Sequence, residues 1–146
     1  MAIELSNESK STCDEPALIS VAQFAVAAMG VHPDSDLSIT IVDEDRMSEL
    51  HIEWMDLPGP TDVLSFPMDE LLPHSHESGP GIIGDIVLCP DFAAKQKVAH
   101  SLSDELALLT VHGVLHCLGY DHAEKEEEIA MFSLQEKILA DWKSTQ

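Results

Sequence analysis

Residues 104–122 of the chain read DELALLTVHGVLHCLGYDH and carry a strong helical signal. Their apolar residues recur at helical spacing, so we expect one helix over residues 104–118. Ser103 is suited to cap its N-terminus, and Gly119 can adopt the left-handed conformation that ends a helix. The chain then reverses direction, which brings His122 back toward the helix.

Three histidines in this stretch have the spacing of a metal site. His112 and His116 are four residues apart, and four residues turn a helix by about 400°, so both rings leave the same face one turn apart. His122 follows the expected turn and can supply a third nitrogen. Three neutral imidazoles leave a fourth tetrahedral position for water, which is the pattern of a catalytic zinc site. We therefore predict one Zn²⁺ ion bound by His112, His116 and His122.

The spacing equals that of the metzincin proteases, HExxHxxGxxH, with one exception. Gly113 stands where those enzymes carry the glutamate that acts as general base. The proton acceptor for a metal-bound water must therefore lie elsewhere. Asp121 is the nearest carboxylate in sequence, and we leave two roles open for it: general base, or the role we favour, that of holding a ligand imidazole in place.

The rest of the chain alternates strand-like and helix-like segments. Strands are expected at residues 2–6, 37–42, 63–66 and 82–89, and further helices at residues 16–29, 43–55, 91–99 and 123–142. Residues 69–80 are polar and predict a mobile loop. This pattern predicts one α+β domain over residues 1–146. The last helix is expected to bury a stripe made of Ile129, Phe132, Gln135, Leu139 and Trp142.

Composition limits the possible partners and compartments. The chain has 27 acidic and 7 basic residues, a formal net charge of -20, which argues against a broad nucleic-acid-binding face. The N-terminus shows no signal peptide, and no apolar run reaches the ~20 residues of a membrane span. The cysteines lack CxxC spacing, so we expect a reduced, cytoplasmic protein. Of these cysteines (Cys13, Cys89 and Cys117), the last is expected to be a small buried apolar residue.

Several segments resemble one known family. Residues 112–122, HGVLHCLGYDH, are similar to the signature of the YbeY family of endoribonucleases, HGxLHLxGYDH. Residues 60–67, PTDVLSFP, and residues 84–89, GDIVLC, are similar to two further blocks of that family. The segment that begins at His100 and leads into ELALLTVHG resembles the family's approach to its metal helix. The similarities occur in the expected order from Leu50 to the C-terminus.

The resemblance implies a metal-dependent endoribonuclease that cleaves single-stranded RNA. It implies roles in maturation of the 3′ end of small-subunit ribosomal RNA (rRNA) and in ribosome quality control, with the small subunit or a ribosomal protein as partner. It also implies a small mixed β-sheet of about four strands flanked by several helices, with a zincin-like metal helix. By carry-over, His112, His116 and His122 are the zinc ligands. Zinc would either lower the pKa of a bound water or polarise a phosphoryl oxygen.

Other residues near the motifs have open roles. Ser65 and Asp62 either contact the substrate or, with Thr61, shape the turn before a strand. Ser65 and Asp121 are the candidates for a catalytic group beyond the metal and its water. Many family members carry an arginine where this chain has Met55. Lys95 or Lys97 could supply the missing cation.

Two alternatives to the ribonuclease remain at this level. A non-enzymatic ribosome assembly factor would hold a structural zinc, with a fourth protein ligand closing the site. A metallopeptidase would share the histidine spacing but is disfavoured by Gly113. Because RNA is repelled by a surface with a charge of -20, we expect a ribosomal partner to recruit the protein.

Overall fold

The computed structural model describes residues 2–96 and 100–146. The strands are β1 (Ala2–Asn7), β2 (Asp36–Ile41), β3 (Val63–Pro67) and β4 (Ile82–Leu88). The helices are α1 (Glu15–Ala28), α2 (Glu44–Met55), α3 (Pro90–Gln96), α4 (Leu102–Cys117) and α5 (Lys125–Lys143). A short 3₁₀ helix, His76–Ser78, interrupts the polar segment that was expected to be a loop. The predicted helix over residues 91–99 is confirmed as far as Gln96, and residues 97–99 lie outside the described residues.

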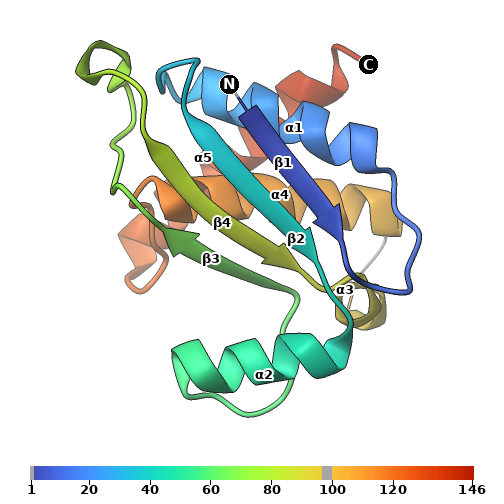
Figure 1. Ribbon diagram of the computed structural model, residues 1–146. Helices are drawn as coiled ribbons and strands as arrows, with labels where there is room; N and C mark the ends of the chain where they lie inside the picture. The colour runs from blue at the N-terminus through green and yellow to red at the C-terminus, as the bar shows by residue number, and fades with distance from the viewer. Residues whose placement is uncertain (1, 97–99) are drawn as a thin grey trace.

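The four strands form one mixed sheet in the order β1-β2-β4-β3. β1, β2 and β4 are parallel to one another, whereas β3 runs antiparallel to β4 at an edge. Helices α1, α4 and α5 cover one face of the sheet (Figure 1). The predicted α+β architecture is therefore confirmed.

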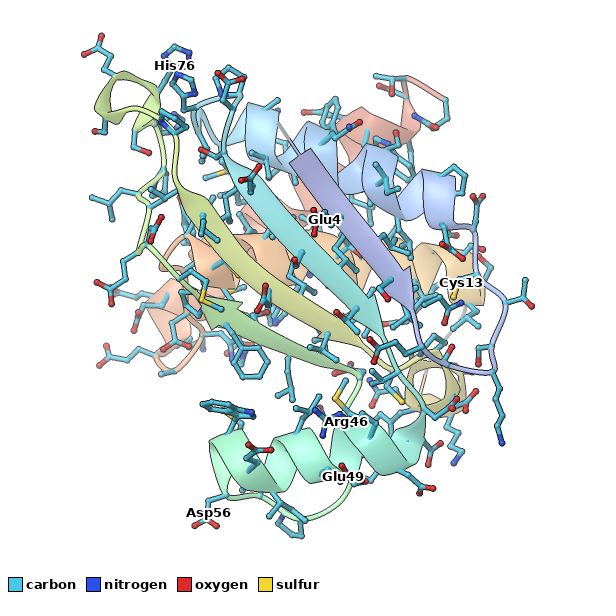
Figure 2. All side chains as sticks on the ribbon, viewed as in Figure 1. Glu4, Cys13, Arg46, Glu49, Asp56 and His76 are labelled. Atoms are coloured by element: carbon cyan, nitrogen blue, oxygen red, sulfur yellow. The ribbon has the colours of Figure 1, made fainter. Side chains whose placement is uncertain are left out.

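Alternation of apolar and polar residues along the strands explains why the two faces of the sheet differ. Leu37, Ile39 and Ile41 of β2 are buried in the main core beneath the helices, whereas Ser38 and Thr40 between them are half-buried on the other face. A smaller apolar cluster joins that other face to α2, and its buried members are Val42, Met47, Leu64, Val87 and Cys89. The rest of this face carries polar side chains such as Glu4 (Figure 2).

Helix α4 begins at Leu102, two residues before its predicted start at Asp104. Ser101, not Ser103, is the N-cap, and its Oγ accepts a hydrogen bond of 3.1 Å from the N–H of Asp104. Either serine satisfies the local rule for a cap. Leu102 is half-buried against the core, which is consistent with a helix that starts before it.

The buried stripe of α5 differs from the predicted one. Met131, Gln135, Ile138 and Trp142 are buried, while Ile129 and Phe132 are 58% and 37% exposed. The buried residues follow the spacing i, i+4, i+7 and i+11, which is also helical, so periodicity alone did not choose between the two stripes. None of the helices in the described parts of the chain combines the length and hydropathy needed to cross a membrane.

Candidate metal centre

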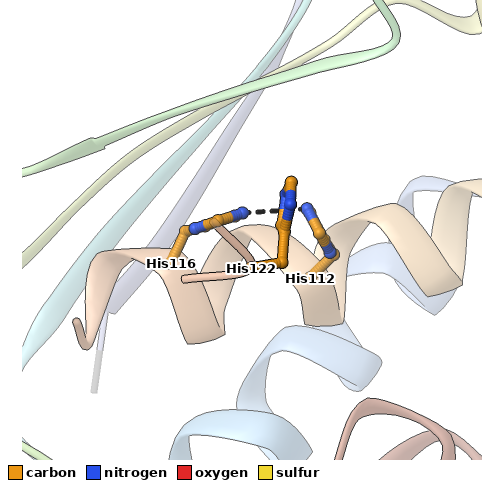
Figure 3. A group of neighbouring side chains, drawn as sticks. All are labelled: His112, His116 and His122. Atoms are coloured by element: carbon orange, nitrogen blue, oxygen red, sulfur yellow. Dashed lines mark hydrogen bonds between the residues drawn. The ribbon is translucent and has the colours of Figure 1, made fainter. Parts of the chain in front are cut away.

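Three histidines meet near the C-terminal end of α4 (Figure 3). His112 and His116 extend from the last two turns of the helix, and Gly119 has a φ of 98°, the left-handed conformation that lets the chain turn back. His122 lies in the segment between α4 and α5. One nitrogen from each of the three rings lies within 4.8 Å of the others. Within residues 2–96 and 100–146, no other group of histidine, cysteine or acidic side chains is arranged in this way.

The two helical imidazoles have fixed orientations. The Nδ1–H of His112 donates to Oε1 of Gln135 at 2.8 Å, and the Nδ1–H of His116 donates to the carbonyl oxygen of Tyr120 at 2.9 Å. In each neutral ring the proton therefore sits on Nδ1, and Nε2 keeps its lone pair. The two Nε2 atoms face each other 3.0 Å apart.

This donor set fits a metal ion. Two lone pairs that face each other at 3.0 Å repel unless a cation lies between them. Two nitrogens bound to one zinc at tetrahedral angles are about 3.3 Å apart, because each Zn–N bond is about 2.0–2.1 Å. The separation of the two Nε2 atoms is close to this value.

Burial lowers the pKa of both helical imidazoles. The pKa of His112 lies below its ordinary value of 6.5 chiefly because burial disfavours the cation, and nearby His122 adds to the effect. The pKa of His116 is lowered by burial first and by His112 second. The hydrogen bonds to Gln135 and Tyr120 oppose these shifts without cancelling them. Both rings are therefore neutral near pH 7, the form that binds a metal.

The described side chains leave a fourth coordination position open. No fourth histidine, cysteine or acidic residue in the described parts of the chain joins the three histidines. Cys117 is 1% exposed and lies on the sheet side of α4, where its Sγ would be 2.9 Å from a Cβ atom added to Gly84. Burial raises its pKa to about 12, so the thiol stays protonated. Its predicted role as a buried apolar residue is confirmed.

Gly113 also faces the sheet rather than the three histidines. A Cβ atom added to it would lie 3.0–3.1 Å from three side-chain carbons of Ile86 on β4. A glutamate at this position would have to enter the core. The packing of α4 on β4 therefore explains why the metzincin base is missing here.

Comparison with known proteins identifies the family. A sequence model of the endoribonuclease YbeY family matches residues 4–143. The chain belongs to the endoribonuclease YbeY family. A YbeY endoribonuclease of Rhodococcus erythropolis is 62% identical over 148 residues, covering 97% of this chain and 82% of the relative. One of Mycolicibacterium smegmatis is 58% identical over 152 residues, covering 100% of this chain and 85% of the relative.

A solved structure shares the fold of this YbeY family member. The solution structure of a Thermotoga maritima protein aligns with a TM-score of 0.59 at 26% sequence identity. The alignment covers 98% of this chain and 93% of the other. The similarity therefore extends over the whole sheet and all its helices, not only over the metal helix.

Asp121 bonds to the backbone beside the centre, and its carboxylate raises the pKa of the His116 imidazole, so its predicted role of holding a ligand imidazole stays a prediction. Its Oδ1 accepts a hydrogen bond of 2.7 Å from the backbone N–H of His122. The groups that hold the two helical imidazoles are Gln135 for His112 and the Tyr120 carbonyl for His116. Asp121 was favoured because it is adjacent in sequence, whereas Gln135 reaches the centre from α5. The one feature of the sequence that marks Gln135 is that it is a polar residue within the otherwise apolar stripe of the last helix.

In the TDVLSF segment, Thr61 and Asp62 precede the edge strand β3, and residues 63–66 form most of it. Ser65 is paired with Ile86 of β4 in the sheet. Its neighbour Leu64 is buried in the smaller apolar cluster on the α2 side. Because successive side chains of a strand point to opposite faces, Ser65 points to the α4 side of the sheet. Asp62 raises the pKa of His112, which places its carboxylate within electrostatic reach of the centre. Asp62 also accepts a hydrogen bond from Nε2 of Gln96, and Thr61 donates to it at 3.4 Å. The segment thus has both a structural role and a position facing the metal helix.

Lys95, one of the two lysines considered as a substitute for the arginine, is paired with a carboxylate. Met55 ends α2 and is 54% exposed. The ammonium of Lys95 forms an ion pair of 2.5 Å with Glu44. Lys97, the other candidate, lies outside the described residues. Arg46, the one arginine of the chain, pairs with Glu49 at 3.0 Å on α2 (Figure 2).

Proposed function

We propose that this protein is a zinc-dependent endoribonuclease that cleaves single-stranded RNA, with His112, His116 and His122 as the metal ligands. The observation that carries the proposal is the cluster of three imidazoles, in which one nitrogen from each ring lies within 4.8 Å of the others and the two helical Nε2 atoms are 3.0 Å apart. Family membership supports the reaction, since the relatives in Rhodococcus and Mycolicibacterium are named endoribonucleases. Zinc suits three nitrogen donors better than magnesium or calcium, which prefer oxygen.

The chain's own residues prepare the centre for this chemistry. Gln135 and the Tyr120 carbonyl hold the Nδ1 protons, so that both Nε2 atoms remain available. Burial keeps the rings neutral. A bound zinc ion supplies a Lewis acid that stabilises negative charge on phosphate and lowers the pKa of water. Ser65 faces the same side and is our candidate for contact with the substrate; Asp121 is exposed beside His122 and is our candidate for a proton acceptor.

The substrate we propose is rRNA in the cytoplasm, at the 3′ end of the small-subunit precursor, together with a role in ribosome quality control. Strong electrostatic attraction to RNA is not expected from a protein with a net charge of -20. We therefore propose that the small subunit or one of its basic proteins positions the enzyme on its substrate.

The two alternative functions are less well supported. An assembly factor with a structural zinc would need a fourth protein ligand, and none joins the three histidines in the described part of the chain. A metallopeptidase would need a general base next to His112, where Gly113 packs against Ile86 instead.

The test is cleavage of end-labelled single-stranded RNA and of its duplex by zinc-loaded protein. A His116→Ala variant removes one ligand, and His32→Ala removes a histidine on another part of the surface as a matched control. A precursor carrying the small-subunit 3′ end is tested both as free RNA and within assembled particles. We expect wild type and His32→Ala to cut single strands and His116→Ala to be inactive while folded.

The outcomes separate the candidate functions. Equal cleavage by all three proteins would identify a contaminating nuclease. No cleavage of free or ribosome-bound RNA by zinc-loaded wild type would contradict the proposal and favour the assembly factor. Cleavage only within particles would support recruitment by a ribosomal partner.

A further inference from the structure

Phe132 is an exposed aromatic ring at the metal centre. Its centroid lies 6.2 Å from that of His112 and 5.8 Å from that of His122, with tilts of 46° and 43°. The residue is nevertheless 37% exposed, whereas the other three phenylalanines of the chain are half-buried. One side of the ring therefore packs beside two of the three histidines while another side faces solvent.

Packing around the histidines explains only part of this arrangement. An apolar side chain beside metal ligands limits water access to them. Leucine or isoleucine would limit water access equally well. A ring that served only to exclude water would be expected to be buried. A partly exposed aromatic ring next to a reactive centre is also well placed to contact a substrate.

Four of the six lysine and arginine residues that the structure describes are paired with carboxylates, which leaves few cations to hold RNA at this centre. Lys95 and Arg46 pair with Glu44 and Glu49 of α2. The other ion pairs of lysine within the described residues are Lys137 with Asp141 and Lys143 with Asp104. Phosphate contacts alone therefore give weak attachment, and a second source of binding is needed. Stacking of bases on aromatic rings is such a source and is independent of charge.

We propose that the exposed face of Phe132 stacks against one unpaired nucleobase of the RNA, next to the phosphate held at the three histidines. This inference rests on the proposed function and explains how the enzyme would prefer single-stranded RNA. Both faces of a base inside a duplex are covered by its neighbours, whereas an unpaired base can leave the stack and lie on a protein ring. Phe132 thus contributes to the preference for single strands without reading sequence.

The test is a double-mutant cycle between one side chain and one base. Binding is measured by fluorescence anisotropy with single-stranded RNA whose phosphorothioate linkages slow cleavage. An abasic nucleotide is placed at each position in turn. The zinc-loaded proteins are wild type, Phe132→Leu, Phe132→Tyr, and Ile129→Ala as a control for loss of an exposed apolar residue one turn earlier, which is itself 58% exposed.

We expect one abasic position to weaken binding to wild type by roughly 5- to 100-fold, the range typical of a stacked base. Phe132→Leu should weaken binding of intact RNA by a similar factor, and the same abasic position should then cost less than about twofold more. Phe132→Tyr should stay within about twofold of wild type, and so should Ile129→Ala. Zinc content, measured by atomic emission, should be equal in all four proteins.

Two results would overturn the inference: an abasic penalty that is as large in Phe132→Leu as in wild type, or a loss of affinity that follows a loss of zinc. Cleavage of unmodified RNA by wild type, both as free RNA and within assembled particles, is measured in parallel. If wild type cleaves and the cycle shows no coupling, the inference fails and the proposed function stands. If wild type binds with coupling but does not cleave, stacking stands and the nuclease proposal fails. If it neither binds nor cleaves, both fail.

Discussion

The two helical imidazoles of the metal centre depend on acceptors from different parts of the chain. His116 is held by the carbonyl of Tyr120, four residues away, so the turn after α4 fixes it locally. His112 is held by Gln135, 23 residues away on α5. The orientation of one ligand is thus a local property of the motif, while the other depends on the docking of a separate helix.

Removing the acceptor on Gln135 should weaken metal binding. Gln135→Leu keeps the volume but leaves the Nδ1–H of His112 without its acceptor, so the ring can rotate or change tautomer. Loss of such a partner typically costs 10- to 100-fold in metal affinity, and we expect about that for zinc measured by chelator competition. Gln135→Glu, which retains an acceptor, should bind zinc at least as tightly as wild type. Equal affinity for Gln135→Leu and wild type would show that Gln135 does not position His112.

Residue-level prediction from the sequence succeeded where contacts are local. The spacing of His112, His116 and His122 was enough to predict that the three rings meet, because helix geometry and one glycine determine it. The partner of His112 was missed, since a contact between two helices has no spacing rule. Phe132 was assigned to the buried stripe for the same reason, and its true position depends on how α5 rotates against α4.

At the level of elements, two glycines allow α4 to lie close to the sheet. Gly113 on α4 faces Ile86, and Gly84 on β4 faces Cys117 of α4 and the carbonyl oxygen of Phe66 on β3. Gly84 also has a φ of 153° and lies where the register between β2 and β4 shifts. The metal helix, the edge strand and the central strand therefore meet at Gly84.

Adding a methyl group at Gly84 should destabilise the fold. A Cβ atom there would lie 2.4 Å from the Phe66 oxygen and 2.9 Å from Sγ of Cys117, and the backbone conformation is itself unfavourable for alanine. We expect Gly84→Ala to lower the free energy of unfolding in urea by about 2–4 kcal/mol. Gly59→Ala is the control, because its φ is +81° and its Cβ would meet nothing within 4 Å; it should cost only about 1–2 kcal/mol. Equal losses would mean that backbone strain, not the close approach of α4, explains the effect.

Element order was predictable because each helix and strand has its own hydrophobic period. The predicted segments match the observed ones to within a few residues, including the short strand over residues 63–66. The ends of helices were harder to predict where two residues are equally suited to cap the helix, as Ser101 and Ser103 are at the start of α4. Sheet order is not contained in local periodicity, and the mixed sheet was expected only from the resemblance to YbeY proteins.

For the whole molecule, the dominant feature is negative charge. The net charge of -20 includes acidic residues on the sheet face that the helices leave open, such as Glu4 (Figure 2). Several cations that might offset this charge locally are already paired with carboxylates. We therefore expect RNA to be bound mainly by the metal centre, by apolar contact, or through a partner.

Binding of single-stranded RNA should consequently depend only weakly on salt. Each phosphate neutralised by a protein cation adds about -0.7 to the slope of log K against log salt concentration for a single strand. With no more than about two such contacts, we expect a slope between zero and about -1.5 from 50 to 300 mM salt, measured by anisotropy. Met55→Arg is the matched variant, because it adds one guanidinium at the exposed end of α2. It should tighten binding and steepen the slope by about 0.7. A wild-type slope of about -3 or steeper would reveal a basic RNA-binding surface and remove the need for a recruiting partner.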